Sequence, residues 1–160
     1  MHQTGSGAHL HAHVMRMLGM FRTSWEDLTD EKLNAEPGFT PANTILQLAV
    51  HVAGSTRFWT ISNTGGVDFH RDRDAEFLAV GTGAQIRADY DLLVDQISAH
   101  LPNLSANDLA GTPTFPASGM SAFSGPLSAG DGVIHAIEHI GIHLGHVQIQ
   151  RQMLGLAPVS

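Results

Sequence analysis

Four stretches of the chain carry apolar residues at the spacing of an amphipathic helix. The first predicted helix covers residues 8–28, where apolar side chains recur every three or four positions. The second begins at Thr40-Pro41, with threonine as N-cap and proline at the first helical position, and ends at residues 63–66, NTGG. The third covers residues 82–101 and the fourth residues 131–154. No stretch shows the alternation of a β-strand, so the pattern predicts an all-α protein.

Four amphipathic helices of this length predict a four-helix bundle in a single domain, residues 1–160, with residues 1–7 flexible. Residues 67–81 are polar and irregular, and residues 102–130 are rich in glycine, proline and serine without a helical period. About 15 residues at ~3.3 Å each can cross the ~30 Å length of such a bundle. The second and third helices can therefore run parallel, and a simple up-down-up-down order is not required.

Composition and charge exclude several classes of protein. The formal net charge is −7 and no cluster of lysine and arginine occurs, so we expect no nucleic-acid partner. No apolar run approaches the ~20 residues of a membrane span, and the N-terminal sequence does not resemble a signal peptide, which predicts a cytoplasmic location. Without cysteine, the chain has no disulfide, no thiolate metal ligand and no cysteine nucleophile.

Histidine is unusually abundant, with eleven residues, and four of them share one face of the last predicted helix. At 100° per residue, His135, His139, His143 and His146 fall within about 80° of one another. The other faces of this helix are apolar, so we expect it to be central and buried, with its histidines facing the interior or a cleft. An unpartnered buried polar group costs ~1–3 kcal/mol. A metal ion would offset that cost, because neutral imidazole binds zinc, nickel, iron and copper.

The proposed ligands are His51, His139 and His143. Side chains at positions i and i+4 of a helix lie ~6 Å apart at Cβ and can converge on one ion, but a third ligand must come from elsewhere. His51 is the only histidine in the middle of any of the first three predicted helices. His9, His11 and His13 near the N-terminus are more typical of a solvated face or of adventitious binding.

Four further residues are candidates for the same cleft, each with a structural alternative. His135, His146 and Glu138 could line the cleft or hydrogen-bond behind the ligands, or lie at the boundary of the core. Arg57, six residues after His51, could orient a substrate carboxylate or be a plain surface arginine.

Two known histidine motifs are excluded. A zinc protease motif, HExxH, needs glutamate directly after its first histidine, and Ile140 occupies that position after His139. A di-iron bundle needs inward carboxylates in Glu-x-x-His pairs, which the last helix lacks.

Two segments, LQLAVHVAGSTRFW and HAIEHIGIHLGHVQIQRQML, resemble the DinB/YfiT-like superfamily of metal-binding four-helix bundles. The family has a histidine about ten residues into its second helix and H-x3-H-x-G-Q near its end. His51, His139 and His143 match the three family ligands and Gly145 matches the glycine, whereas His146 replaces the usual glutamine. The resemblance implies an up-down-down-up bundle, a divalent metal (often zinc or nickel) and a homodimer. Its characterised members include S-transferases and isomerases that use mycothiol, bacillithiol or glutathione.

The sequence therefore predicts a metal-dependent enzyme, a thiol-dependent S-transferase or a hydrolase, that acts on a small-molecule substrate. The thiol would be a low-molecular-weight cosubstrate, because the chain has no cysteine. Residues 111–130 would either cover the site as a lid or form an ordinary loop. The alternative function is a non-catalytic bundle that a metal stabilises, or a small-molecule binding module.

Overall fold

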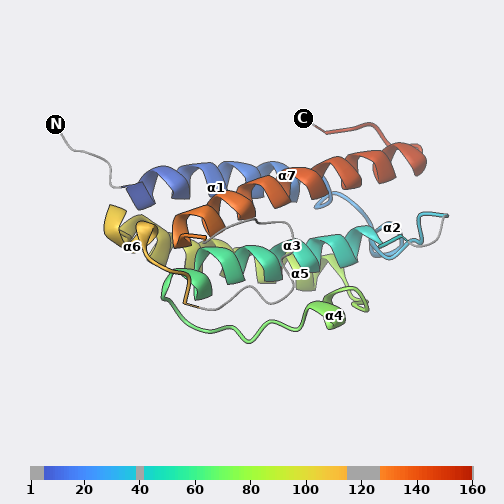
Figure 1. Cartoon of the computed structure of the whole chain (residues 1–160). Helices are drawn as coiled ribbons and strands as arrows, with labels where there is room; N and C mark the ends of the chain where they lie inside the picture. The colour runs from blue at the N-terminus through green and yellow to red at the C-terminus, as the bar shows by residue number, and fades with distance from the viewer. Residues whose placement is uncertain (1–5, 39–41, 115–126, 160) are drawn as a thin grey trace.

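The computed structural model describes residues 6–38, 42–114 and 127–159, and in these ranges it contains helices and no strands (Figure 1). The all-α prediction is confirmed. Residues 1–5, 39–41, 115–126 and 160 lie outside the described residues, and so does much of the lid expected at residues 111–130. The bundle is built from four long helices: α1 (Ser6–Thr23), α3 (Ile45–Thr60), α5 (Gly83–His100) and α7 (Ala129–Met153).

The order of the bundle is up-down-down-up, as the family resemblance implies. In Figure 1, α1 and α7 run in one direction and α3 and α5 in the other. Contacts between the ends agree, because Arg151 at the end of α7 donates a hydrogen bond to the carbonyl of Ser24, just after α1. At the other end, Gly7 in α1 lies against the carbonyl of Leu101, just after α5.

Short helices lie in all three connections between the four long helices. A single turn has too few residues to show a hydrophobic period, and local caps define it instead. The Asp72 side chain accepts from the backbone N–H of Ala75, and Ser105 forms a capping box with Asp108. The short elements are α2 (Asp30–Leu33), η1 (Ser62–Thr64), α4 (Arg73–Glu76), η2 (Leu101–Asn103) and α6 (Ala106–Ala110).

The predicted boundaries of two long helices were wrong. The N-cap of α3 is Thr44 rather than Thr40, and Thr44 forms a capping box with Gln47 that fixes the first turn. Helix α1 ends at Thr23, five residues before the predicted end at 28, because residues 24–27 continue as turns. Trp25 and Leu28 nevertheless stay buried, so the apolar pattern continued past the helix that it predicted.

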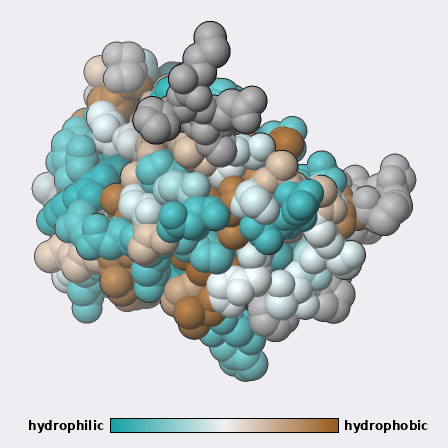
Figure 2. Space-filling model, turned by 90° about the vertical axis from the view of Figure 1, so that its left-hand side faces the viewer, coloured by the Kyte–Doolittle hydropathy of each residue, from teal (hydrophilic) through white to brown (hydrophobic). Residues whose placement is uncertain are grey.

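The core lies between the four long helices, and α7 contributes one face to it. Ile140 and Val147 of α7 are fully buried, and the Tyr90 hydroxyl of α5 donates to the carbonyl of Ala49 in α3. The last helix was expected to be central and buried, and this was wrong for one of its faces: Ile142 is 58% and Ile149 56% exposed. At the end of the bundle where α1 begins, hydrophobic residues are scattered among hydrophilic ones (Figure 2).

Membrane-spanning helices were not expected from the sequence. Within the described ranges, no helix combines the length and the apolar character that crossing a bilayer requires.

Gly7 offers a test of the packing between α1 and the end of α5. Ser6 and Gly7 belong to α1, and a Cβ on Gly7 would lie 2.2 Å from the carbonyl oxygen of Leu101 and 2.7 Å from that of Leu104. Since these are backbone atoms, Gly7→Ala should lower the free energy of unfolding by ~1–3 kcal/mol in urea denaturation. Gly19→Ala is the control, because among the described residues no atom beyond its chain neighbours and the local helix backbone lies within 4 Å of its Cβ position. That variant should be neutral or up to ~1 kcal/mol more stable, and equal effects of the two substitutions would contradict the packing.

Candidate metal centre

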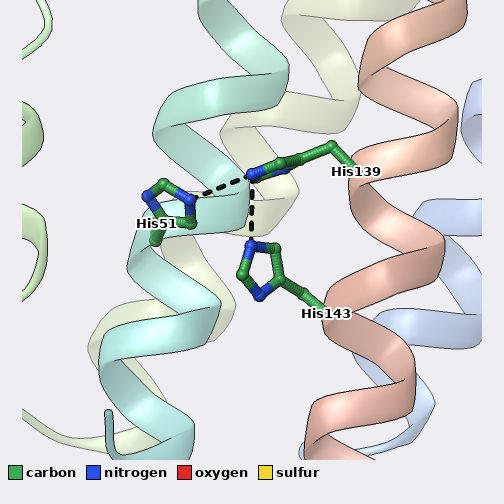
Figure 3. A group of neighbouring side chains, drawn as sticks. All are labelled: His51, His139 and His143. Carbon is green, nitrogen blue, oxygen red and sulfur yellow. Dashed lines mark hydrogen bonds between the residues drawn. The ribbon is translucent and has the colours of Figure 1, made fainter. Parts of the chain in front are cut away.

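Three histidines meet between α3 and α7 (Figure 3). His51 lies on α3, while His139 and His143 lie one turn apart on the facing side of α7. The Nε2 atom of His139 is 3.0 Å from Nε2 of His51 and 3.1 Å from Nε2 of His143. All three candidate ligand atoms lie within 4.8 Å of one another. The structure thus brings together the three residues that the sequence proposed as ligands.

This geometry fits a divalent metal ion. Zinc binds histidine nitrogen at about 2.0–2.1 Å, which places two ligand atoms of a tetrahedral site about 3.3 Å apart. The two separations that involve His139 are close to that value, and the third pair of nitrogens lies within 4.8 Å, so the rings of His51 and His143 would turn toward each other around an ion. Imidazole is also a suitable donor for nickel, copper and iron. The cluster could therefore hold a metal ion, and its donor atoms do not single out one metal.

The far nitrogen of His51 is held by a buried carboxylate. Nδ1 of His51 lies 2.7 Å from Oε2 of Glu76, the last residue of α4. Arg71 donates from Nε to Oε1 of Glu76 at 2.7 Å and from Nη2 to Oε2 at 2.8 Å. Burial alone raises the pKa of Glu76, but the hydrogen bonds from Arg71 and His51 outweigh it and lower the pKa overall. Glu76 is thus a carboxylate at neutral pH.

The far nitrogens of the other two candidate ligands differ. Nδ1 of His143 is 3.3 Å from Nδ1 of His146, which is itself exposed. Nδ1 of His139 is buried and has no hydrogen-bond partner among the described residues. The His135 ring lies edge-on to Trp59 at 5.2 Å, and its centroid is 5.7 Å from that of His139. His135 and His146 therefore lie beside the cluster but add no ligand atom to it.

The surroundings of His139 and His143 strongly favour neutral imidazoles. Burial, followed by the neighbouring histidines, lowers the pKa of His139 to about 2. Burial, followed by His51 and His146, lowers the pKa of His143 to about 4. Burial also lowers the pKa of His135. Neutral rings keep the lone pairs that a metal requires.

The remaining candidates lie farther out. Glu138 is exposed on α7. Arg57 lines a cleft of about 310 Å³ together with Arg71 and Glu76, and its guanidinium donates to Asp89 and Gln96 on α5. Their part in a substrate site stays a prediction.

Three residues that contact His51 were missed by the sequence analysis. Besides Arg71 and Glu76, the Phe77 ring lies 4.4 Å from that of His51, centroid to centroid. All three belong to the stretch interpreted as an irregular connection. Its charged run, HRDRDAE, was the only available signal, and it does not say which carboxylate turns inward.

The fold and the cluster together define a class: helical bundles in which histidines of two neighbouring helices converge on one point. The family model described as the DinB superfamily matches residues 14–147. The chain therefore belongs to the DinB superfamily.

Two solved structures are similar in fold. A DinB-like protein from Bacillus cereus is 19% identical, with a TM-score of 0.67 over 92% of this chain and 89% of that chain. A conserved protein from Enterococcus faecalis is 14% identical, with a TM-score of 0.68 over 94% of this chain and 98% of that chain. No curated protein matches the sequence at a significant level.

The metal-free protein should lose stability in acid. Imidazoles of the unfolded chain titrate near the ordinary pKa of 6.5, whereas His143 and His139 titrate near 4 and 2 when folded. The unfolded state therefore binds more protons below pH 6.5, and stability falls by up to ~1.4 kcal/mol per pH unit for each such proton. Both histidines contribute to this loss of stability between pH 6.5 and 4, and only His139 contributes to it below pH 4.

Urea denaturation in the presence of chelator, at several pH values between 7.5 and 4.5, measures this loss. In the His139→Leu variant, the free energy of unfolding should fall less steeply with falling pH, and the difference in slope should correspond to about one bound proton. An unchanged slope in that variant would show that His139 does not stay neutral in the folded protein.

Proposed function

We propose that the protein is a divalent-metal-dependent enzyme that transfers a thiol, or adds water, to a small electrophilic substrate. The observation that carries the proposal is the convergence of three Nε2 atoms from α3 and α7 without a fourth protein ligand among the described residues. Structural zinc sites are usually closed by four protein ligands, whereas catalytic sites have three and keep one position for water or substrate.

The neighbouring polar residues support an open site. His146 meets His143 at Nδ1, on the ring edge away from the cluster, so it is placed to act behind the ligand. The Glu76 carboxylate is already engaged by His51 and Arg71. A fourth histidine nitrogen beside the other three would instead have favoured the non-catalytic, metal-stabilised alternative.

The chemistry follows from the neutral donor set. A zinc or nickel ion held by the three imidazoles would lower the pKa of a water or a thiol, which supplies a nucleophile at neutral pH. The chain itself contributes no thiol, so an S-transfer would use a low-molecular-weight cosubstrate. His51, His139 and His143 supply bare nitrogens, and α3 and α7 hold them in place.

Metal analysis tests the ligand assignment. Full-length protein with His9, His11 and His13 changed to alanine serves as the background, because His9 and His13 lie side by side on α1 and can bind metal adventitiously. After chelation and reloading, this protein should retain about one equivalent of zinc or nickel. His51→Ala, His139→Ala and His143→Ala should each lose it, and stoichiometric metal in any of them would refute that ligand.

Activity and ligand exchange separate the catalytic proposal from its alternative. Zinc- and nickel-loaded protein would be incubated with electrophilic substrates, with and without mycothiol, bacillithiol or glutathione. We expect turnover that His143→Ala abolishes. In cobalt-loaded protein, an added thiol should change the visible spectrum by occupying the open position. Bound metal with neither turnover nor a spectral change would favour the non-catalytic bundle.

We also propose that the protein forms a homodimer, through the exposed face of α7. Ile142, Ile149 and Met153 lie within about 40° of one another on that helix, and all three are more than half exposed. A stripe of this kind is typical of a surface that a partner covers. Light scattering coupled to size exclusion should give twice the chain mass, and Ile149→Glu should give the mass of one chain. A monomer before substitution would contradict the proposal.

A further inference from the structure

We propose that Glu76, held by Arg71, is a positioning residue that fixes His51 with its Nε2 lone pair toward the cluster, and that Gly54 provides the space for it. The inference rests on the proposed metal site and concerns what makes that site competent. The geometric basis is the contact of His51 Nδ1 with Oε2 of Glu76 at 2.7 Å, in a place where both side chains are buried.

The contact determines where the proton of His51 lies. A carboxylate can only accept a hydrogen bond, so Nδ1 carries the proton and Nε2 of the neutral ring is bare. Nη2 of Arg71 also lies 3.2 Å from Nδ1. Nη2 of Arg71 and the protonated Nδ1 of His51 are then both donors, so they cannot hydrogen-bond to each other. The guanidinium therefore donates to Glu76 and not to the ring. Arg71 thus donates to Glu76, and Glu76 accepts the hydrogen bond from Nδ1 of His51. The Nε2 lone pair of His51 then faces the other two histidines.

Arg71 is what allows the carboxylate to lie beside the ring. The Glu76 side chain is only 7% exposed, and a buried charge without a partner is costly. Two hydrogen bonds from one guanidinium, one to each carboxylate oxygen, satisfy it and restrict its orientation. Phe77 covers the same ring, with centroids 4.4 Å apart. The segment 71–77 therefore holds His51 from the side opposite α7.

Gly54 lies three residues after His51 on α3, directly under the carboxylate. A Cβ at this position would lie 2.2 Å from Oε1 and 3.1 Å from Cδ of Glu76. Any side chain here displaces the carboxylate. Because the displaced group is the end of a flexible side chain, the fold can adapt, but the hydrogen bond to His51 is lost. Gly54→Ala thus removes the contact without altering either partner.

Metal affinity is the first readout. Groups that orient a metal-binding histidine typically contribute 10–100-fold to metal affinity. Zinc competition with a chromophoric chelator, on the whole chain, should show zinc affinity that is about 10–100-fold weaker in Glu76→Ala and in Gly54→Ala. Asp74→Asn is the matched control, since it removes an exposed carboxylate from the same short helix and should bind zinc like the unsubstituted protein. Unchanged affinity in Glu76→Ala and Gly54→Ala would overturn the proposal.

Thermal melting of the metal-free proteins separates positioning from folding. Alanine favours a helix more than glycine does, so Gly54→Ala should melt at or above the temperature of the unsubstituted protein while its zinc affinity falls. If affinity falls only where the melting temperature falls with it, the role of the segment is structural and the proposal is wrong.

The tautomer of His51 is the second readout, and it needs no metal. Nitrogen-15 NMR of the metal-free protein at pH 7.5, with the ring assigned by comparison with His51→Gln, should show Nδ1 protonated and Nε2 bare. In Glu76→Ala the ring should become a mixture of tautomers. A protonated Nε2 in the unsubstituted protein would overturn the inference. If the protein binds no zinc, the proposed function fails, while the tautomer still decides the role of Glu76.

Discussion

The three imidazoles can meet only while α3 and α7 keep one axial register, and much of the bundle serves to hold that register. At one end, Gly132 of α7 lets the helix approach Trp59, since a Cβ there would lie 2.8 Å from the indole ring. At the other end, the Gln150 side chain donates to the carbonyl of Asn43, just before α3. A slip of one residue would move α7 by about 1.5 Å and change the facing side by about 100°. His139 and His143 would then no longer face His51.

The same constraint explains the charge state of the site. A packed interior disfavours protonated rings, so His139 and His143 have lowered pKa values and remain neutral. The charges next to His51 belong to Glu76 and Arg71, which neutralise each other. His139 and His143 therefore present neutral rings with lone pairs at neutral pH. This is the condition that a cation-binding site of imidazoles requires.

The sequence was informative where residues repeat with a helical period. Apolar spacing located the long helices, and the interval of four in α7 identified His139 and His143 as neighbours. His51 was found because it stands alone in the middle of a helix. Glu76 could not be found in this way, because its contact with His51 depends on the path of an aperiodic connection. The start of α3 was misplaced for a related reason: the Thr44–Gln47 capping box, not the more familiar Thr-Pro pair, sets it.

The central claim is that His51, His139 and His143 hold one divalent ion and leave a position open. A crystal structure of the zinc-loaded protein, with anomalous diffraction data at the zinc edge, tests it most directly. The account predicts one strong peak about 2.0–2.1 Å from Nε2 of all three histidines, with a fourth position taken by a non-protein ligand. A peak elsewhere, for example at His9 and His13, or a fourth protein ligand on the ion, would contradict it.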